Sequence, residues 1–177
     1  MENSNYELIP LIKKSDIEKK IDKLANEINN YFINQEIVII GVLNGSLFFM
    51  ADLLKKIKTP FVYDFIQAKS YKGTKSSGNV KIVKKPYIDI NGKVVLIVED
   101  IIDTGITLQK IVDYFSKGGA KKIYICTLLD KKGTRKIEIE ANFIGFNIDN
   151  HFVVGYGLDL DEKFRNLEEI FIYKPIS

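Results

Sequence analysis

The chain contains 177 residues, of which 46% are hydrophobic and 28% are charged, and its formal net charge is +3. A chain of this length forms about one domain, 1–177, and this composition excludes a disordered or collagen-like protein. The longest apolar run, residues 37–43, is too short to span a bilayer, and the first residues lack the basic and apolar regions of a secretion signal. The single cysteine, Cys126, excludes an internal disulfide, so we expect a cytoplasmic protein.

The rarity of histidine and cysteine restricts the chemistry. His151 and Cys126 are each the only residue of their type, so the four ligands of a structural zinc site are lacking. The G-x-S-x-G, P-loop and G-x-G-x-x-G patterns are absent. We therefore expect carboxylate, lysine, hydroxyl and backbone chemistry with a hard ion such as Mg²⁺.

Basic residues are abundant but dispersed. The 26 cations are 24 lysines and two arginines, Arg135 and Arg165. Their alternation with acids favours a solvated surface over a stripe that binds nucleic acid. An arginine in so lysine-rich a chain points to a bidentate anion contact, which lysine makes poorly.

The first half of the chain alternates helix and strand patterns. Residues 15–32 carry apolar side chains at helical spacing and predict an amphipathic helix with Ser15 as its N-cap. Residues 37–43 are typical of a strand buried on both faces. A helix over 46–56 and a strand over 61–68 follow. Residues 69–79 have no apolar periodicity, and we expect either a disordered connection or a functional lid there.

The second half continues the alternation. Asn91-Gly92 predicts a tight turn before a buried strand over 93–98. A helix over 107–117 ends at a glycine pair, and a third buried strand covers 122–129. This order predicts an α/β fold with an open, mostly parallel, twisted sheet flanked by helices. Ligands of such sheets bind beyond the carboxyl ends of the strands, near a topological switch point.

Three acids follow the central strand directly. Glu99 and Asp100 come after five apolar residues, and two isoleucines separate Asp100 from Asp103. In one interpretation this is a capping region, with Asp103 or Thr104 as the N-cap of the next helix. That interpretation leaves the pair Glu99 and Asp100 unexplained. Because consecutive strand residues point to opposite faces, these two carboxylates can address different groups of one ligand, such as the hydroxyls of a ribose.

The turn after the acids fits a phosphate. Residues 103–107 contain two threonine hydroxyls, a glycine and the first amides of a helix, which together form an anion-binding nest. Without a P-loop lysine, a phosphate monoester is the better ligand. Diol and monophosphate in one motif describe a ribose 5-phosphate.

Residues 95–108, VLIVEDIIDTGITL, resemble the phosphoribosyl-pyrophosphate signature of type I phosphoribosyltransferases, in particular of the hypoxanthine(-guanine) branch. The resemblance covers about residues 11–173. It implies that the sheet carries a small hood subdomain, to which about 143–177 contributes and which binds the purine. It also implies that phosphoribosyl pyrophosphate is bound by the following residues: Glu99, Asp100, Asp103, Thr104, Gly105, Ile106 and Thr107.

Two loops match other family segments. Residues 41–46 resemble the pyrophosphate loop, which implies that Leu43, Asn44 and Gly45 bind pyrophosphate. In relatives the peptide bond equivalent to that between Leu43 and Asn44 is often cis; by itself the segment is typical of an ordinary strand-to-helix turn. Asn44 stands where many relatives have a basic residue. Ser70 and Tyr71 resemble the dipeptide of the family's mobile lid, here 69–80, which would exclude water from the reaction.

The purine-binding residues are implied by two further segments. Lys131 aligns with the family lysine that reaches the 6-oxo group, and an ammonium donates to a carbonyl but not to an amino group. Residues 152–159 resemble the base-binding segment. They imply that Phe152 stacks on the purine and that the backbone of Val153 pairs with its edge. Asp159 would hold a second Mg²⁺, beside the site of Glu99 and Asp100, and Arg165 would bind pyrophosphate.

The resemblance implies purine salvage: transfer of the phosphoribosyl group to N9 of hypoxanthine, and of guanine, with Mg²⁺ as cofactor and Asp103 as the catalytic base at N7. A xanthine-preferring enzyme and an RNA-binding regulator that senses phosphoribosyl pyrophosphate are the alternatives. Adenine fits Lys131 badly. We expect no nucleic-acid or membrane partner, and a homodimer or homotetramer.

Overall fold

The computed structural model describes residues 5–70 and 80–176, and the statements below concern these residues. Its helices are α1 (Lys14–Tyr31), α2 (Leu47–Leu54) and α3 (Ile106–Lys117), with a 3₁₀ turn, η1 (Lys132–Thr134). The strands are β1 (Tyr6–Ile12), β2 (Ile37–Leu43), β3 (Phe61–Ser70), β4 (Val80–Lys84), β5 (Val94–Ile102), β6 (Lys122–Asp130), β7 (Phe143–Asn147), β8 (Val153–Val154) and β9 (Ile170–Pro175).

The main sheet has six strands in the order β4-β3-β2-β5-β6-β7, parallel except for β4. From β2 the chain proceeds to β3 on one side, and from β5 it proceeds to β6 on the other. The carboxyl ends of β2 and β5 therefore meet at a topological switch point, where α/β sheets bind their ligands. The predicted mostly parallel sheet is confirmed.

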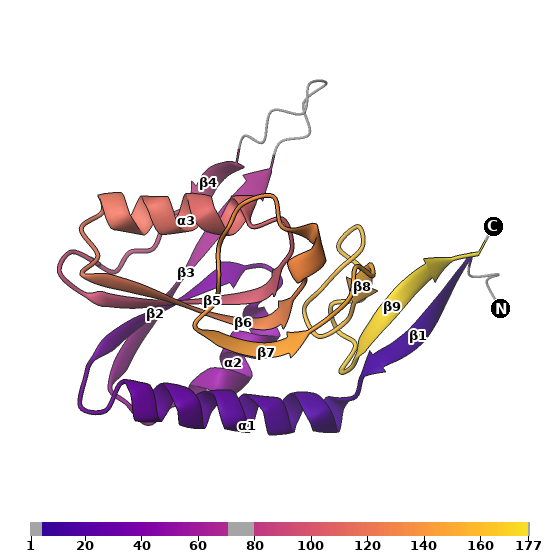
Figure 1. Ribbon diagram of the computed structural model, residues 1–177, viewed down its shortest axis with the longest axis horizontal. Helices are drawn as coiled ribbons and strands as arrows, with labels where there is room; N and C mark the ends of the chain where they lie inside the picture. The colour runs from indigo at the N-terminus through magenta and orange to yellow at the C-terminus, as the bar shows by residue number, and fades with distance from the viewer. Residues whose placement is uncertain (1–4, 71–79, 177) are drawn as a thin grey trace.

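Helices cover both faces of this sheet, with α1 and α2 on one side and α3 on the other (Figure 1). Alternate residues of each central strand belong to two separate cores, as the two-residue period of a strand requires. Ile39 and Leu96 pack under α1 and α2 with Ile21, whereas Ile40 and Ile97 pack under α3. The unalternated apolar runs of β2 and β5 thus reflect burial on both faces.

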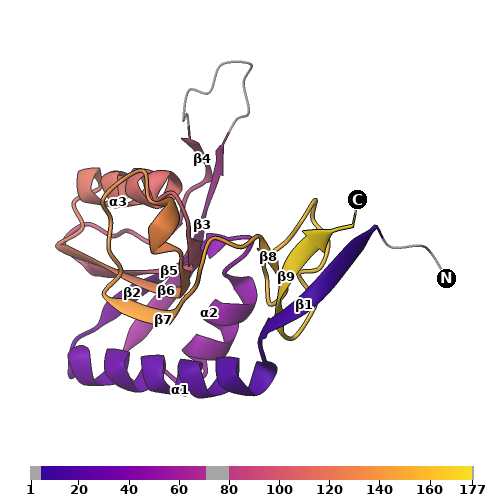
Figure 2. The same cartoon turned by 45° about the vertical axis from the view of Figure 1, so that its right-hand side comes forward.

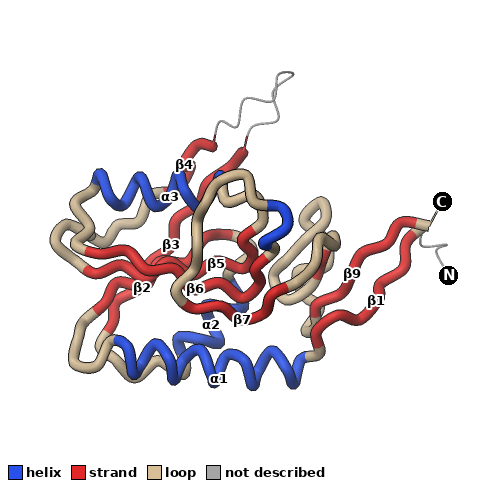
Figure 3. Tube along the Cα trace, viewed as in Figure 1, coloured by secondary structure: helices blue, strands red, loops and turns tan. Residues whose placement is uncertain are grey.

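A small second sheet projects beyond one end of the main sheet (Figure 2). Its order is β1-β9-β8, with antiparallel pairing, so it is built from both ends of the chain. We call this sheet, together with the loop over 155–169, the hood. Strand β7, within the segment expected to contribute to the hood, pairs with β6 in the main sheet instead (Figure 3).

Some sequence expectations about the elements were wrong. Ser15 lies inside α1 and is not its N-cap, because β1 ends at Ile12 and the chain turns at Lys13, which occupies the cap position without a side-chain hydrogen bond. Strand β5 continues past Val98 to Ile102, because its pairing with β6 continues to Asp130. The short strands β1 and β4 were not predicted. Tyr71 and most of the predicted lid lie outside the described residues.

Candidate active site

The acids that follow the apolar run lie at the carboxyl end of β5. Glu99 is buried and only 7% exposed, and it lines a cavity of about 90 Å³ together with the turn that follows the strand. The residues of this cavity are Glu99, Ile101, Ile102, Asp103, Thr104, Gly105, Thr107 and Leu108. Asp100 does not line this cavity, and its carboxylate lies against Gly45, where an added Cβ would overlap it. The two side chains are nevertheless neighbours, since each carboxyl affects the pKa of the other, so the strand's alternation does not separate them fully.

The pair of carboxylates binds protons more tightly than exposed acids do. Burial, and then the charge of the adjacent Asp100, raises the pKa of Glu99 well above its ordinary value. Burial likewise raises the pKa of Asp100, although the positive charge of Arg165 opposes this rise. A buried and a half-buried carboxylate side by side are poised to accept a cation or hydroxyl donors, either of which would favour the ionised pair.

The carboxylate of Asp103 is not used to cap the helix that follows β5. Helix α3 begins at Ile106, and its N-cap is Gly105, which adopts φ 82° and makes no side-chain capping hydrogen bond. The interpretation of Asp103 or Thr104 as a helix cap is therefore wrong. The Asp103 carboxylate, whose side chain is 48% exposed, lies 3.7 Å from Nζ of the buried Lys131. The candidate base and the candidate purine-reading lysine are neighbours.

The predicted pyrophosphate loop lies beside this turn. The peptide bond between Leu43 and Asn44 is cis. Asn44 is exposed, and its side-chain oxygen accepts a hydrogen bond from Nε2 of Gln67 at 3.1 Å. Gly45 is buried between two partners, since an added Cβ would overlap the Asp100 carboxylate and the Gly45 carbonyl itself contacts Gly157 of the hood. Close backbone packing thus joins the loop, β5 and the hood.

The hood loop is shaped by three consecutive residues with positive φ, Gly155, Tyr156 and Gly157. The Tyr156 hydroxyl donates to a carboxylate oxygen of Asp52 on α2 at 2.7 Å. Tyrosine is uncommon in this backbone region, and the hydrogen bond anchors it against the main domain.

Arg165 is held at the mouth of the hood loop. Its Nη1 donates to the Gly157 carbonyl at 2.7 Å, and its Nη2 lies 2.8 Å from both Asp159 and Glu162. Its positive charge acts to lower the pKa of Asp100 and so opposes the effect of burial there. The two residues predicted for metal and pyrophosphate, Asp159 and Arg165, therefore form an ion pair.

The predicted base-stacking residue lies on the hood. Phe152 is 50% exposed and packs edge-on against Tyr173, which leaves room for a planar ligand. Val153 is buried in β8 and pairs with Ile172 of β9. Among the described residues, no hydrogen bond or ion pair joins these two to the β5 turn. His151 is exposed, as expected of a surface residue.

Sequence reasoning missed two features of the site. The bond between Tyr156 and Asp52 joins residues far apart in the chain, and nothing local indicates it. Arg135 was noted only as an arginine retained among lysines; it lies next to the β5 turn and pairs with the buried Asp130. We expected an arginine in so lysine-rich a chain to bind an anion in a bidentate way. Arg135 instead contacts one carboxylate and several carbonyls.

Known proteins resemble the chain over most of its length. The family model described as "Phosphoribosyl transferase domain" matches residues 11–161. The hypoxanthine-guanine phosphoribosyltransferase of Bacillus subtilis is 46% identical over 93% of this chain and 92% of its own. A crystal structure of the hypoxanthine-guanine phosphoribosyltransferase of Bacillus anthracis aligns with a TM-score of 0.89 at 43% identity, over 94% of this chain and 99% of that one. The hypoxanthine phosphoribosyltransferase of Staphylococcus aureus aligns with a TM-score of 0.91 at 39% identity, over 99% and 97% of the two chains.

Proposed function

The chain belongs to the phosphoribosyl transferase family, and we propose that it transfers the 5-phosphoribosyl group of phosphoribosyl pyrophosphate to N9 of hypoxanthine and guanine. The bond from C1 of the sugar to the pyrophosphate oxygen breaks, and the bond from C1 to N9 forms. The purine gives up one proton, and the products are a purine nucleotide and pyrophosphate. The observation that carries this proposal is the position of Asp103, beside Lys131 and at the edge of the cavity of the β5 turn.

The sugar phosphate is assigned to the end of β5. Glu99 and Asp100 accept hydrogen bonds from the two ribose hydroxyls, and their negative charge stabilises the positive charge that develops on the ring. The amides of the turn and the hydroxyls of Thr104 and Thr107 bind the 5-phosphate. The cavity of about 90 Å³ that Glu99, Thr104 and Thr107 line supports this assignment.

The leaving group is assigned to the loop on the other side of the switch point. Backbone amides of Leu43, Asn44 and Gly45 donate to pyrophosphate oxygens, and Arg165 adds a fixed positive charge. The contact between Gly45 and Asp100 supports this arrangement, since it brings the loop against the acids that orient the sugar.

The purine is assigned to the residue that follows β6 and to residues of the hood. Lys131 donates to the 6-oxo group, Phe152 stacks on the ring, and the Val153 backbone pairs with the purine edge. Asp103 takes the proton from N7 while N9 attacks. An ammonium as the donor favours 6-oxopurines over adenine.

The acids also suit Mg²⁺, which we propose as the cofactor. Carboxylate oxygens are the ligands that this ion prefers, and the buried pair Glu99 and Asp100 is expected to ionise more readily beside a cation. Within residues 5–70 and 80–176 no group of three or more potential ligands gathers, so a bound ion would take its other ligands from substrate and water, as Mg²⁺ commonly does. Glu99 and Asp100 are the residues that would hold one ion, and Asp159 would hold a second. When bound, the ion neutralises charge on the departing pyrophosphate.

We further propose a cytoplasmic homodimer or homotetramer. No helix of the described segments is long and apolar enough to cross a membrane. The buried thiol of Cys126, the chain's one cysteine, fits a reducing compartment. Exposed apolar side chains on α2 and β3, those of Leu47, Phe48, Val62 and Tyr63, support self-association, which sedimentation velocity tests.

A substrate panel tests the proposal. Hypoxanthine, guanine, xanthine, adenine and orotate are each incubated with phosphoribosyl pyrophosphate and Mg²⁺, and nucleotides are separated by chromatography. We expect the nucleotides of hypoxanthine and guanine, none from adenine or orotate, and loss of product when a chelator removes Mg²⁺. If no nucleotide formed, the proposed enzymatic activity would be wrong. If xanthosine monophosphate were the main product, only the proposed specificity for hypoxanthine and guanine would be wrong.

A further inference from the structure

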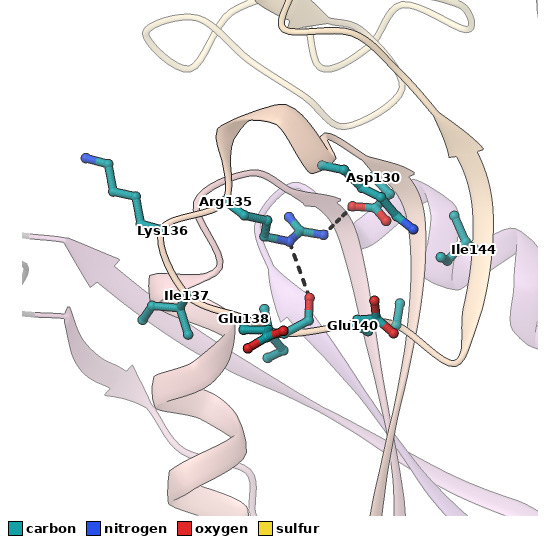
Figure 4. A pocket seen from close by; sticks show the side chains of 10 residues that line it. Asp130, Arg135, Lys136, Ile137, Glu138, Glu140 and Ile144 are labelled. Atoms are coloured by element: carbon teal, nitrogen blue, oxygen red, sulfur yellow. Dashed lines mark hydrogen bonds and ion pairs between the residues drawn. The ribbon is translucent and has the colours of Figure 1, made fainter.

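Arg135 lies in the segment after β6, where its guanidinium contacts Asp130 and Ile139 (Figure 4) and also the β5 turn. Its Nη1 donates to the carbonyls of Ile102, at 2.8 Å, and Asp103, at 2.7 Å. Its Nε donates to the carbonyl of Ile139 at 3.3 Å, and its Nη2 pairs with the carboxylate of Asp130. Every nitrogen of the guanidinium therefore has a partner. Asp130, its carboxylate partner, is only 1% exposed, so the ion pair is buried on that side.

The same segment also holds the turn through its backbone. The amide of Lys131 donates to the Ile102 carbonyl at 3.0 Å, and the amides of Lys136 and Ile137 donate to the Thr104 carbonyl at 3.0 and 3.2 Å. The carbonyls of three successive residues, 102, 103 and 104, thus all face residues 131–137. Among them, the Asp103 carbonyl is held by Arg135 alone, within the described residues.

Because of peptide geometry, the hydrogen bonds to these carbonyls also orient the backbone amides on the opposite side of the turn. In a planar trans peptide the C=O and the following N–H point in opposite directions. Fixing the carbonyls of 102, 103 and 104 therefore directs the amides of Asp103, Thr104 and Gly105 away from Arg135. Gly105 keeps the turn close to this segment, since an added Cβ would crowd Ile139 and Ile137.

We infer that Arg135 is a positioning residue for the reaction: its guanidinium, oriented by Asp130, aims the amides of the β5 turn at the 5-phosphate and fixes the backbone that carries the Asp103 carboxylate. This inference rests on the proposed function. A lysine cannot replace Arg135, because an ammonium lacks the planar fork that reaches two carbonyls and a carboxylate together.

Three variants test the inference. Arg135→Lys keeps a cation beside Asp130 but loses the fork. The double variant Arg135→Met with Asp130→Leu removes both charges, so that no buried charge is left unpaired, and its melting temperature reports whether the fold is kept. Glu140→Gln is the control, because its side chain is exposed and makes no hydrogen bond or ion pair within the described residues (Figure 4).

We expect the control to match the wild-type chain in kcat and in both KM values. Since a misplacement of about 1 Å costs on the order of 10²-fold in rate, we expect the double variant to lose on the order of 10²-fold in kcat while its melting temperature stays near that of the wild type. KM for phosphoribosyl pyrophosphate should rise about tenfold in Arg135→Lys and in the double variant, and KM for hypoxanthine should stay within about twofold.

Either of two results would overturn the inference. One is a folded Arg135→Lys with wild-type kcat and KM. The other is an equal change of both KM values that follows the melting temperature from variant to variant, as a purely structural role requires. An inactive wild-type chain would instead contradict the proposed function, so the two failures are distinguishable.

Discussion

Nζ of Lys131 lies 3.7 Å from Oδ2 of Asp103, which brings together the ends of β6 and β5. Lys131 is 6% exposed, so its ammonium is held beside the Asp103 carboxylate and is not free in solvent. A base that accepts the N7 proton and a donor to the 6-oxo group must address one purine together. In the proposed reaction this pair would serve both proton transfer and substrate choice.

Replacing Asp103 by asparagine should reduce turnover without preventing binding. The amide cannot accept the N7 proton, and general base catalysis contributes about 10²–10⁴-fold, so kcat should fall within that range. Calorimetric titration should show phosphoribosyl pyrophosphate binding as in the wild type. Asp113→Asn, on the exposed surface of α3, serves as control and should leave kcat unchanged. Full turnover in the Asp103 variant would show that Asp103 is not the catalytic base.

Replacing Lys131 by methionine should weaken the use of 6-oxopurines. The thioether keeps the volume but donates no hydrogen bond, and a bond from a charged donor is worth about 1.5–3 kcal/mol, or about 10–150-fold in kcat/KM for hypoxanthine. The neighbouring Lys132→Met, at an exposed position, should change kcat/KM by less than about twofold. An equal loss in both variants would mean that general positive charge, and not the position of Lys131, binds the base.

Adding a methyl group at Gly45 should separate the pyrophosphate loop from β5. The new Cβ would overlap the Asp100 carboxylate, so either the loop or the acid must move. We expect Gly45→Ala to lower kcat/KM for phosphoribosyl pyrophosphate by tenfold or more, on the order of what a shift near 1 Å costs. At Gly133 an added Cβ has no heavy atom within 4 Å, so Gly133→Ala should have wild-type kinetics. Equal activities of the two alanine variants would contradict this packing argument.

The carboxylate of Asp64 should contribute measurably to the pH dependence of the free energy of unfolding in acid. Burial acts to raise its pKa, but hydrogen bonds from the amides of Phe65, Tyr87 and Ile88 and from Lys84 hold that pKa below its ordinary value. Because the folded pKa is lowered, the stabilisation is complete above the unfolded value of about 3.9 and is lost as the pH falls through the folded value.

Urea denaturation of Asp64→Asn checks this. The free energy of unfolding at pH 7 should fall by about 2 kcal/mol, and its decline below about pH 4 should become shallower than in the wild type. Asp161→Asn, on an exposed loop residue, is the control for the loss of one charge. Parallel pH curves for the wild type and Asp64→Asn would show that this carboxylate does not carry the effect.

The sequence predicted the parts of the site that depend on local pattern. The apolar runs of β2 and β5 indicate strands buried on both faces, and the acids and the glycine-containing turn follow directly, so their place at the carboxyl end of the sheet could be inferred. The structure confirms this placement for Glu99, Asp103 and Thr107.

The rest depends on contacts between distant segments. Strand β1 is short and pairs only with β9 at the opposite end of the chain, so its sequence gives no hint of the hood. The same holds for Tyr156, whose partner Asp52 lies on α2, and for Arg135, whose carbonyl partners end β5. Side-chain type can indicate that such a partner exists, but only the fold identifies it.

The crystal structure of the chain with bound inosine 5′-monophosphate tests the central claim most directly. We predict the phosphate on the amides and hydroxyls of the turn at 103–107, the ribose hydroxyls on Glu99 and Asp100, and the base oxygen on Lys131 with Phe152 against the ring. A nucleotide bound elsewhere, such as in the cavity of about 330 Å³ beside Arg135 and Glu138, with the acids of β5 untouched, would contradict the account.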